Sequence, residues 1–233
     1  MMKNSLLKLS IIALLFTSCA KNETTTDTSL KYSFSAINLN STLSATASAS
    51  GVVVAAGTNG SINWTGVSVN VSKLEFTASH GGTTKSVEIK NLNSVNALKP
   101  DSLSGKVALT SGVYEKLQFK LTMAESASNP PFILTGTYIE ASGTKIPVVV
   151  QLNQSQLINL EAARLEVDKG TYIAKVTLEL NALVKGLVTS DFGQTVRTGA
   201  NNTIVVNSTT NRALYEKLTG RLASTASISI VKQ

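Results

Sequence analysis

Apolar and polar residues alternate along much of this chain, and this alternation limits the fold more than any other feature of the sequence. Leu30, Tyr32 and Phe34 are separated by polar residues, and the segment 117–123 repeats the pattern. A period of two places apolar side chains on one face of a β-strand and polar side chains on the other. Each sheet should therefore have one face in the core and one face in water. Further strands are predicted at 67–76, 132–140, 146–152, 157–167, 172–180 and 226–231.

Turn signals separate several of these strands. Gly81-Gly82 follows a strand that ends near Ala78, and Asp168-Lys169-Gly170 lies between two predicted strands, so both segments predict hairpin turns. Within 67–76 the alternation slips by one residue between Val71 and Leu74. A slip of this kind predicts a β-bulge inside one strand.

Two short helices are expected near the C-terminus, at 182–188 and 211–222. In the second segment leucines recur at helical spacing, and either Thr210 or Asn211 can serve as the N-cap. Residues 41–60 are mostly Ser, Thr, Ala, Gly and Val, and Val52-Val53-Val54 favours a strand there over the alternative of a loop.

These patterns together predict the fold class. Short strands, polar turns and the lack of a long helical pattern predict an all-β protein, an antiparallel β-sandwich of the immunoglobulin or transthyretin type with one or two short helices near the C-terminus. The sandwich should occupy residues 30–233. No linker divides this segment, and two packed subdomains are the alternative arrangement.

The only cysteine of the chain, Cys19, follows a short apolar run. Lys3 and Lys8 precede the run at 9–16, which is the arrangement of a signal peptide. The run is shorter than the ~20 residues that a membrane-spanning helix needs. Phe16-Thr17-Ser18-Cys19 resembles the lipobox of bacterial lipoproteins, with Phe16 in place of the usual leucine. The resemblance implies removal of residues 1–18 and a lipid on Cys19. The alternative is an ordinary signal peptide with an incidental cysteine.

The residues after the cysteine are polar and rich in threonine, so the segment 19–29 is predicted to be a flexible tether. Some lipoproteins of Bacteroidota carry a lysine followed by acidic residues at this place and travel to the cell surface, and Lys21-Asn22-Glu23 resembles that signal in part. A lipid with two or more acyl chains gives a stable membrane anchor. We therefore expect an exported protein that is lipid-anchored to the outer membrane. The cell surface and the periplasmic side of this membrane are the two alternatives for its location.

Several pieces of the sandwich segment together resemble one family. They are Ile62-Asn63-Trp64-Thr65-Gly66 with the strand that follows, Ser111-Gly112-Val113-Tyr114, and Asn207 to Asn211 with Leu214-Tyr215. These pieces are similar to uncharacterised β-sandwich lipoproteins of Bacteroidota, related in style to transthyretin-like and fimbrillin-like domains. The resemblance implies that Tyr114 packs across one end of the sandwich. It brings no catalytic residues.

The composition argues against several classes of function. The net charge is +7, but the lysines are spread singly along the strands, so no nucleic-acid partner is expected. One histidine, His80, and one cysteine cannot supply a zinc site, and no metal or cofactor is expected. His80 is expected in a polar turn, and no Gly-x-Ser-x-Gly motif accompanies it. Glu161 and Glu166 flank Arg164, but nothing in the sequence marks them as a catalytic pair. The chain is therefore not expected to be an enzyme.

Two residues are candidates for contact or modification. Trp64, the only tryptophan, is either an exposed platform that contacts a ligand or a core residue, and the core is favoured because a large ring beside a valine-rich strand usually packs. Asp101-Ser102-Leu103 matches a short acceptor for O-glycosylation in Bacteroidota, which makes Ser102 a candidate modification site.

The sequence thus predicts a membrane-anchored protein with a non-catalytic role in binding, adhesion or envelope structure, whose partner is an unidentified protein or glycan. One alternative is a fimbrillin-like pilus subunit that assembles by strand addition, with 226–231 as the donor strand and an acceptor edge near Val52. The other alternative is a carbohydrate-active enzyme, which would need two close carboxylates in a deep pocket.

Overall fold

A computed structural model of the protein describes residues 28–45, 59–90, 94–99, 105–125 and 128–233. The described residues are mostly β-strand, arranged in three sheets, and the few short helices all lie in the C-terminal part of the chain. The prediction of an all-β fold with short C-terminal helices is therefore confirmed. The segment around Val52, like residues 1–27, lies outside the described residues.

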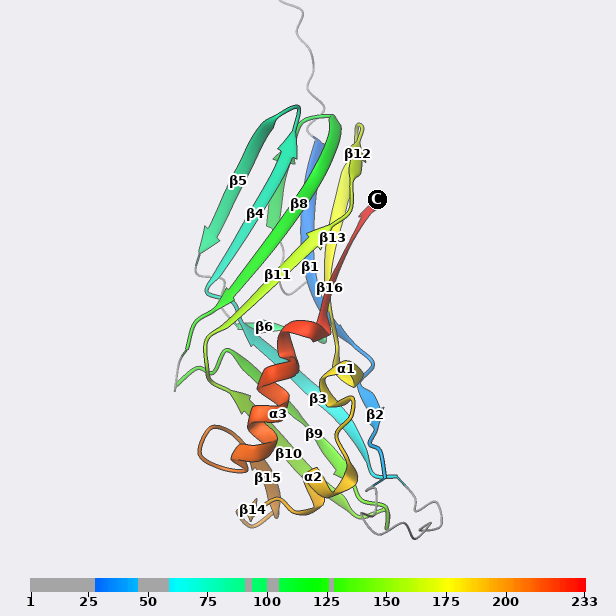
Figure 1. The fold of residues 1–233 in the computed structure, drawn as a ribbon, viewed down its shortest axis with the longest axis vertical. Coiled ribbons are helices and arrows are strands. Elements are labelled where there is room, and N and C mark those ends of the chain that lie inside the picture. The colour runs from blue at the N-terminus through cyan, green and yellow to red at the C-terminus, as the bar shows by residue number, and fades with distance from the viewer. Residues whose placement is uncertain (1–27, 46–58, 91–93, 100–104, 126–127) are drawn as a thin grey trace, which may run out of the picture.

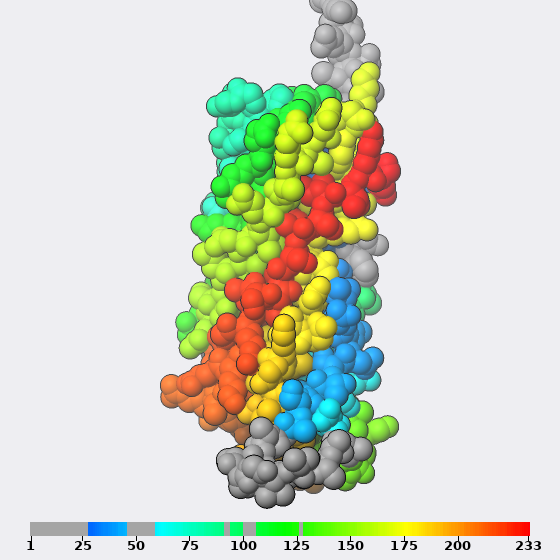
Figure 2. Space-filling model, turned by 45° about the vertical axis from the view of Figure 1, so that its right-hand side comes forward, coloured from blue at the N-terminus to red at the C-terminus, as the bar shows by residue number. Residues whose placement is uncertain are grey.

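Two sheets form a sandwich in the upper half of the molecule (Figure 1). The four-stranded sheet has the order β16 (Ala226–Lys232), β13 (Thr171–Glu179), β1 (Thr28–Ile37) and β7 (Gly105–Leu109). The five-stranded sheet has the order β11 (Gln156–Ala162), β8 (Gly112–Met123), β4 (Lys73–His80) and β5 (Thr83–Lys90), and β12 (Leu165–Val167) also pairs with β8. Edge strand β16 lies next to edge strand β11, so the two sheets meet along this side (Figure 2).

The lower half is a sheet covered by helices (Figure 1). Its seven strands are β14 (Arg197–Thr198), β15 (Thr203–Val206), β10 (Lys145–Leu152), β9 (Phe132–Ile139), β3 (Ser61–Asn70) and β2 (Asn40–Thr42) in this order, with β6 (Ser94–Asn96) also paired to β3. The helices are α1 (Leu180–Val184), α2 (Thr189–Gly193) and α3 (Arg212–Leu222), and a 3-10 turn, η1 (Ala223–Thr225), follows the last. Helix α3 buries Leu214, Tyr215, Leu218 and Leu222.

Three strands of the lower sheet are neighbours in the sequence of three strands of the upper half. Strand β3 leads to β4, β8 leads to β9, and β10 leads to β11, so the order β3-β9-β10 below repeats as β4-β8-β11 above. The slip in alternation between Val71 and Leu74 marks the place where β3 ends and β4 begins. The predicted bulge at this place is wrong, because the chain passes here from one sheet to another. The side chain and backbone of Ser72 both bond to the carbonyl of Thr122, which keeps the strands together across the break.

The bulge of this region lies earlier, between Trp64 and Gly66 of β3. Opposite it in β9, a Cβ on Gly136 would come within 2.4 Å of the carbonyl oxygen of Asn63. Glycine therefore allows the two strands to approach closely at this point.

Two strand pairs depart from the predicted antiparallel arrangement. Strand β1 runs parallel to β13, and β10 runs parallel to β15. Parallel neighbours need a long crossover connection, and here the partners are far apart in the sequence. The alternation cannot reveal this, because it reports which face a side chain occupies and not the direction of the neighbouring strand.

The predicted turns have different outcomes. Gly81 and Gly82, with φ angles of +55° and +77°, join β4 to β5 as a two-residue hairpin, as predicted. The hairpin predicted at 168–170 is wrong, because β12 pairs with β8 whereas β13 pairs with β1 and β16. This turn connects the two sheets of the sandwich. The strand predicted at 157–167 divides into β11 and β12.

Strand β1 begins at Thr28, two residues inside the predicted tether. Thr28 and Ser29 are both buried, and the backbone N–H of Ser29 bonds to the carbonyl of Gly170 at 3.2 Å. These two residues belong to the sandwich because the four-stranded sheet provides a partner for them.

The C-terminal helices agree with the sequence in part. Helix α3 matches the predicted segment, whereas α1 begins two residues before its predicted start and ends four residues before its predicted end. Helix α2 was not predicted. Asn211 precedes α3 with a left-handed φ of 53°, but its side chain makes no capping hydrogen bond to the helix.

Candidate functional site

The structure places Trp64 in the core. Its side chain is 1% exposed, and it is among the largest fully buried side chains of the protein. Of the two alternatives for this residue, the core position is therefore the observed one. A buried ring cannot stack against a ligand at the surface, so Trp64 is removed from the candidate contact residues.

His80 has a packing role at the upper end of the sandwich. Its Nδ1 lies 2.9 Å from the carbonyl oxygen of Val113, and its ring lies 5.1 Å from the ring of Tyr114. The ring occupies space that is open only because residue 112 is glycine, since a Cβ on Gly112 would lie 2.0 Å from His80 Cε1. The hydroxyl of Tyr114 donates to the carbonyl of Thr110 and accepts from its N–H, which is the bonding pattern of a tyrosine corner.

The remaining sequence candidates are not brought together into a site. Cys19 and Ser102 lie outside the described residues. Arg164 contacts Glu115 at 3.6 Å, and Glu161 contacts Lys116 at 3.6 Å. Within the described part of the chain, no three His, Cys, Asp or Glu side chains are grouped as metal ligands, and no helix is long and apolar enough to cross a membrane.

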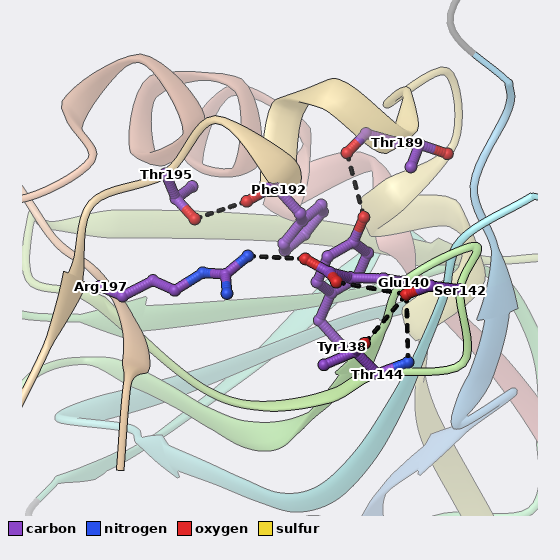
Figure 3. Close-up of polar contacts among 8 residues, drawn as sticks. All are labelled: Tyr138, Glu140, Ser142, Thr144, Thr189, Phe192, Thr195 and Arg197. Carbon is purple, nitrogen blue, oxygen red and sulfur yellow. Dashed lines mark hydrogen bonds and ion pairs between the residues drawn. The ribbon is translucent and has the colours of Figure 1, made fainter. Parts of the chain in front are cut away.

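The loops of the lower half gather at one end of the molecule, which we call the distal end because it lies opposite the start of β1 (Figure 1). It is formed by the β9–β10 turn, helix α2 and the segment around β14. Tyr138 of β9 holds these parts together (Figure 3). Its ring stacks on Phe192 of α2 at 5.3 Å, and its hydroxyl donates to the carbonyl of Thr189 at 3.2 Å.

An ion pair joins two further parts of the distal end. The guanidinium of Arg197 on β14 lies 2.6 Å from a carboxylate oxygen of Glu140, which follows β9 (Figure 3). Both side chains are about one third exposed. Ser142 in the β9–β10 turn donates to the same carboxylate at 3.4 Å. The ion pair therefore ties β14 to this turn at the surface, where a pair of this kind contributes little to stability.

Asn211 fixes the loop before β14. Its side-chain amide accepts from the N–H of Val196 at 2.7 Å and donates to the carbonyls of Val196 and Val205. Its left-handed backbone lets one side chain reach both segments. Val196 is thereby held at the surface with 65% of its side chain exposed, the most exposed large apolar residue among those described.

Thr189 connects the distal end with the N-terminal part of the chain. Its hydroxyl accepts from the N–H of Gly60 at 3.2 Å and donates to the carbonyl of Ser44 at the same distance. The backbone N–H of Thr189 also bonds to Ser44. Ser44 and Gly60, near the ends of two described segments, are therefore both held at this end.

The chemistry of the distal end is suited to contact rather than to proton transfer. Burial raises the pKa of Tyr138, the negative charge of Glu140 raises it further, and the positive charge of Arg197 opposes this. The phenol therefore stays protonated near neutral pH and remains a hydrogen-bond donor. The surface offers hydroxyl and amide groups, the ion pairs Glu140–Arg197 and Asp191–Lys217, and an exposed valine.

The sequence alone does not indicate Tyr138, Glu140 or Arg197 as residues of a site. Glu140 and Arg197 are 57 positions apart, and nothing near either residue in the chain indicates the other. The one local signal is Ser142-Gly143, which lies between two strong strand patterns and indicates a turn. Gly143 has a φ of +87° in this turn, which positions Glu140.

The chain is an elongated all-β protein in which a sandwich at one end is joined to a helix-covered sheet that ends in loops at the other. Comparison of the chain with protein-family models, with curated proteins and with solved structures found no match.

Proposed function

We propose that this chain is an exported lipoprotein, anchored to the outer membrane through a lipid on Cys19, that has a non-catalytic role in binding, adhesion or envelope structure. The observation that carries the proposal is the position of the two ends of the described fold. Strand β1 starts at the upper end, and the β9–β10 turn, α2 and β14 lie at the lower end (Figure 1). An anchor that precedes Thr28 would hold the upper end near the membrane and present the distal end to a partner.

Strand addition in the manner of a pilus subunit is a less favoured proposal. The candidate donor segment, 226–231, already lies in β16 and pairs with β13 from Tyr172–Lys232 to Leu178–Ala226. The strand would have to leave this position before it could join a neighbouring molecule. A stable monomer of the purified chain in size-exclusion chromatography would argue against this alternative.

The anchor is tested by the substitution Cys19→Ser in cells that produce the full chain. We expect the variant to move from the membrane fraction to the soluble fraction, because no thiol remains to carry lipid. Retention of the variant in the membrane would refute the anchor. Protease treatment of intact cells, followed by mass spectrometry, then reports orientation: release of peptides from 30–233 supports adhesion, and protection supports a role inside the envelope.

The distal contact is tested by site-specific photo-crosslinking in the same cells. A benzoylphenylalanine in place of Val196 should give covalent adducts with a partner. The matched control carries the same residue in place of Lys175, which is exposed on β13 in the upper half. Adducts of equal yield from both positions, or from Lys175 alone, would contradict a contact at the distal end.

A further inference from the structure

The polar face of the five-stranded sheet contains a shallow hollow, which we call the polar hollow. It encloses about 350 Å³ and lies over β4, β8 and β11. Its lining consists of Glu75, Thr77, Gln118, Lys120, Asn159 and Glu161, and of Phe119 and Leu160, which alternate with these residues along the strands. The hollow lies in the upper half and is separate from the distal end.

The strand register arranges the polar side chains in two rows. Glu75, Lys120 and Asn159 are paired neighbours across the three strands, and Thr77, Gln118 and Glu161 form the next row. Strands β4 and β8 are interior strands, so their backbone groups bond to neighbouring strands. A ligand in the hollow would therefore be recognised by side chains rather than by strand addition.

The charges of the polar hollow are balanced. Glu75 lies 3.1 Å from Lys73 and 3.4 Å from Lys120, and Glu161 lies 3.6 Å from Lys116. The hydrogen bond from Lys73, together with the charges of Lys120 and Lys73, lowers the pKa of Glu75 against the opposing effect of burial. A carboxylate that remains ionised is an acceptor and a poor general acid. The balance favours neither a polyanion nor a polycation as the ligand.

Three uncharged side chains in the polar hollow are free to bind. Among the described residues, Thr77, Gln118 and Asn159 have no hydrogen-bond partner for their side chains. Each amide offers one acceptor and two donor hydrogens, and the hydroxyl offers both functions. Beside them on the same face of β11, Leu157 exposes 46% of its side chain and provides an apolar contact.

We propose that the polar hollow binds a neutral oligosaccharide. A sugar hydroxyl both donates and accepts, so it can pair with amides, carboxylates and an ammonium group in the same site, and the C–H face of the ring can lie against Leu157. This site does not depend on the lipid anchor or on the distal contact.

The experiment is isothermal titration calorimetry on the full chain, purified in a detergent that contains no sugar. The probes are hexamers of maltose-, cellulose-, mannan- and xylan-type oligosaccharides, with a hexagalacturonate as the acidic comparison. We expect at least one neutral hexamer to bind. Gln118→Ala and Asn159→Ala should each weaken that binding about 5- to 10-fold, as expected from the loss of one or two hydrogen bonds. The matched control, Asn201→Ala, removes an exposed amide in the lower half and should bind as the wild type does.

Three outcomes would overturn the proposal: no neutral hexamer binds at millimolar concentration, only the acidic hexamer binds, or both variants bind as the unaltered chain does. Both substituted side chains are exposed, so the fold of each variant should be intact. Far-UV circular dichroism of each variant checks this. Crosslinking from position 196 should be unchanged in these variants, so failure at the polar hollow is distinguishable from failure at the distal end.

Discussion

The two halves of this protein each contain three matching strands, connected in pairs along the chain, but the two halves cover these strands differently. In the upper half β4, β8 and β11 pack against a second sheet, and in the lower half β3, β9 and β10 pack against helices. The upper half presents a solvent-exposed sheet face with cross-strand lysine–glutamate pairs, whereas the lower half ends in loops with mostly uncharged polar groups. Loops on a rigid scaffold tolerate variation and often carry recognition.

The two halves also differ in how much they depend on particular residues. The upper sandwich has a regular pattern because each strand needs only alternating side chains to bury one face. The distal end needs particular residues at particular places, such as Asn211, which bonds to two separate segments. We therefore expect substitutions in the upper core to affect stability alone and substitutions at the distal surface to affect contact.

The largest expected effect tests whether the halves unfold together. Phe119 in the upper half is 1% exposed, and its ring lies 4.9 Å from Phe76. Phe119→Ala should lower the free energy of unfolding by about 3–5 kcal/mol. Trp64, the only tryptophan, reports on the lower half. Because the chain passes between the halves at β3–β4, β8–β9 and β10–β11, its fluorescence transition should shift together with the circular dichroism transition in guanidinium chloride.

The matched substitution in the lower half is Phe132→Ala in β9, where the side chain is also fully buried. It should shift both signals in the same way. A fluorescence transition that stays in place for Phe119→Ala and moves for Phe132→Ala would show that the halves are separate cooperative units.

A smaller effect is expected from glycines at the two ends of the molecule. Gly112 has a φ of +143°, and a Cβ there would collide with His80, whereas Gly143 has a φ of +87° and open space around it. Gly112→Ala should cost about 2–5 kcal/mol, the sum of backbone strain and overpacking. Gly143→Ala should cost only the strain, about 1 kcal/mol.

The collision can be separated from the strain in a second variant. Adding His80→Ala to Gly112→Ala removes the ring that the new methyl group would meet. Denaturant midpoints should show that Gly112→Ala costs less in the His80→Ala background than in the wild type. Equal costs for Gly112→Ala in the presence and absence of the ring would mean that the collision contributes nothing.

The sequence predicted those parts of the fold that depend on neighbouring residues. The Gly81-Gly82 hairpin, the core-facing side chains of β8 and helix α3 each follow from local spacing. The passage between sheets after Val71 has the same sequence pattern as a bulge, because a slip in alternation looks the same whether the strand continues or the sheet ends. Strand direction and partner depend on residues far away in the chain, as in the parallel pair of β1 and β13.

The candidate sites show the same limit. Trp64 was correctly favoured as a core residue, because its setting beside a valine-rich strand is local information. The Glu140–Arg197 pair and the polar hollow were not predicted, because each joins strands that are distant in the sequence. The rows of the polar hollow depend on the register of β4, β8 and β11, which periodicity alone does not fix.

A third prediction compares two buried tyrosines. The hydroxyl of Tyr114 in the upper half bonds to both the N–H and the carbonyl of Thr110, whereas the hydroxyl of Tyr138 in the lower half bonds to one carbonyl. Tyr114→Phe should cost about 1–2 kcal/mol and Tyr138→Phe about 1 kcal/mol. Denaturant unfolding measures both values, and hydrogen exchange should show faster local opening of α2 only for Tyr138→Phe. A larger cost for Tyr138→Phe would mean that the tyrosine hydroxyl contributes more to stability in the lower half than in the upper half.

The smallest expected effect concerns the C-terminal end of β16 in the upper half. Lys232 contacts both carboxylate oxygens of Asp168 at 2.6 Å, and Tyr172 donates to the same carboxylate. The hydrogen bonds from Lys232 and then from Tyr172 lower the pKa of Asp168 below its ordinary value of 3.8. The contribution of Asp168 to stability is therefore complete above that value and is lost as the pH falls through the lower pKa of the folded state.

Asp168→Asn isolates this contribution. Between about pH 5 and pH 9 the variant should unfold at a slightly lower denaturant concentration than the wild type, by a constant amount that is smaller than for Tyr138→Phe. Below pH 3.8 the difference should shrink, because the wild-type carboxyl is then protonated in the unfolded state and progressively in the folded state. The pKa of Lys232 is raised by the same hydrogen bond, so the contribution of the pair should also decline as the pH rises above 10.5. A difference that widens on acidification would mean that this charge pair does not stabilise β16, and the upper half would then hold its last strand by backbone pairing to β13 and side-chain packing alone.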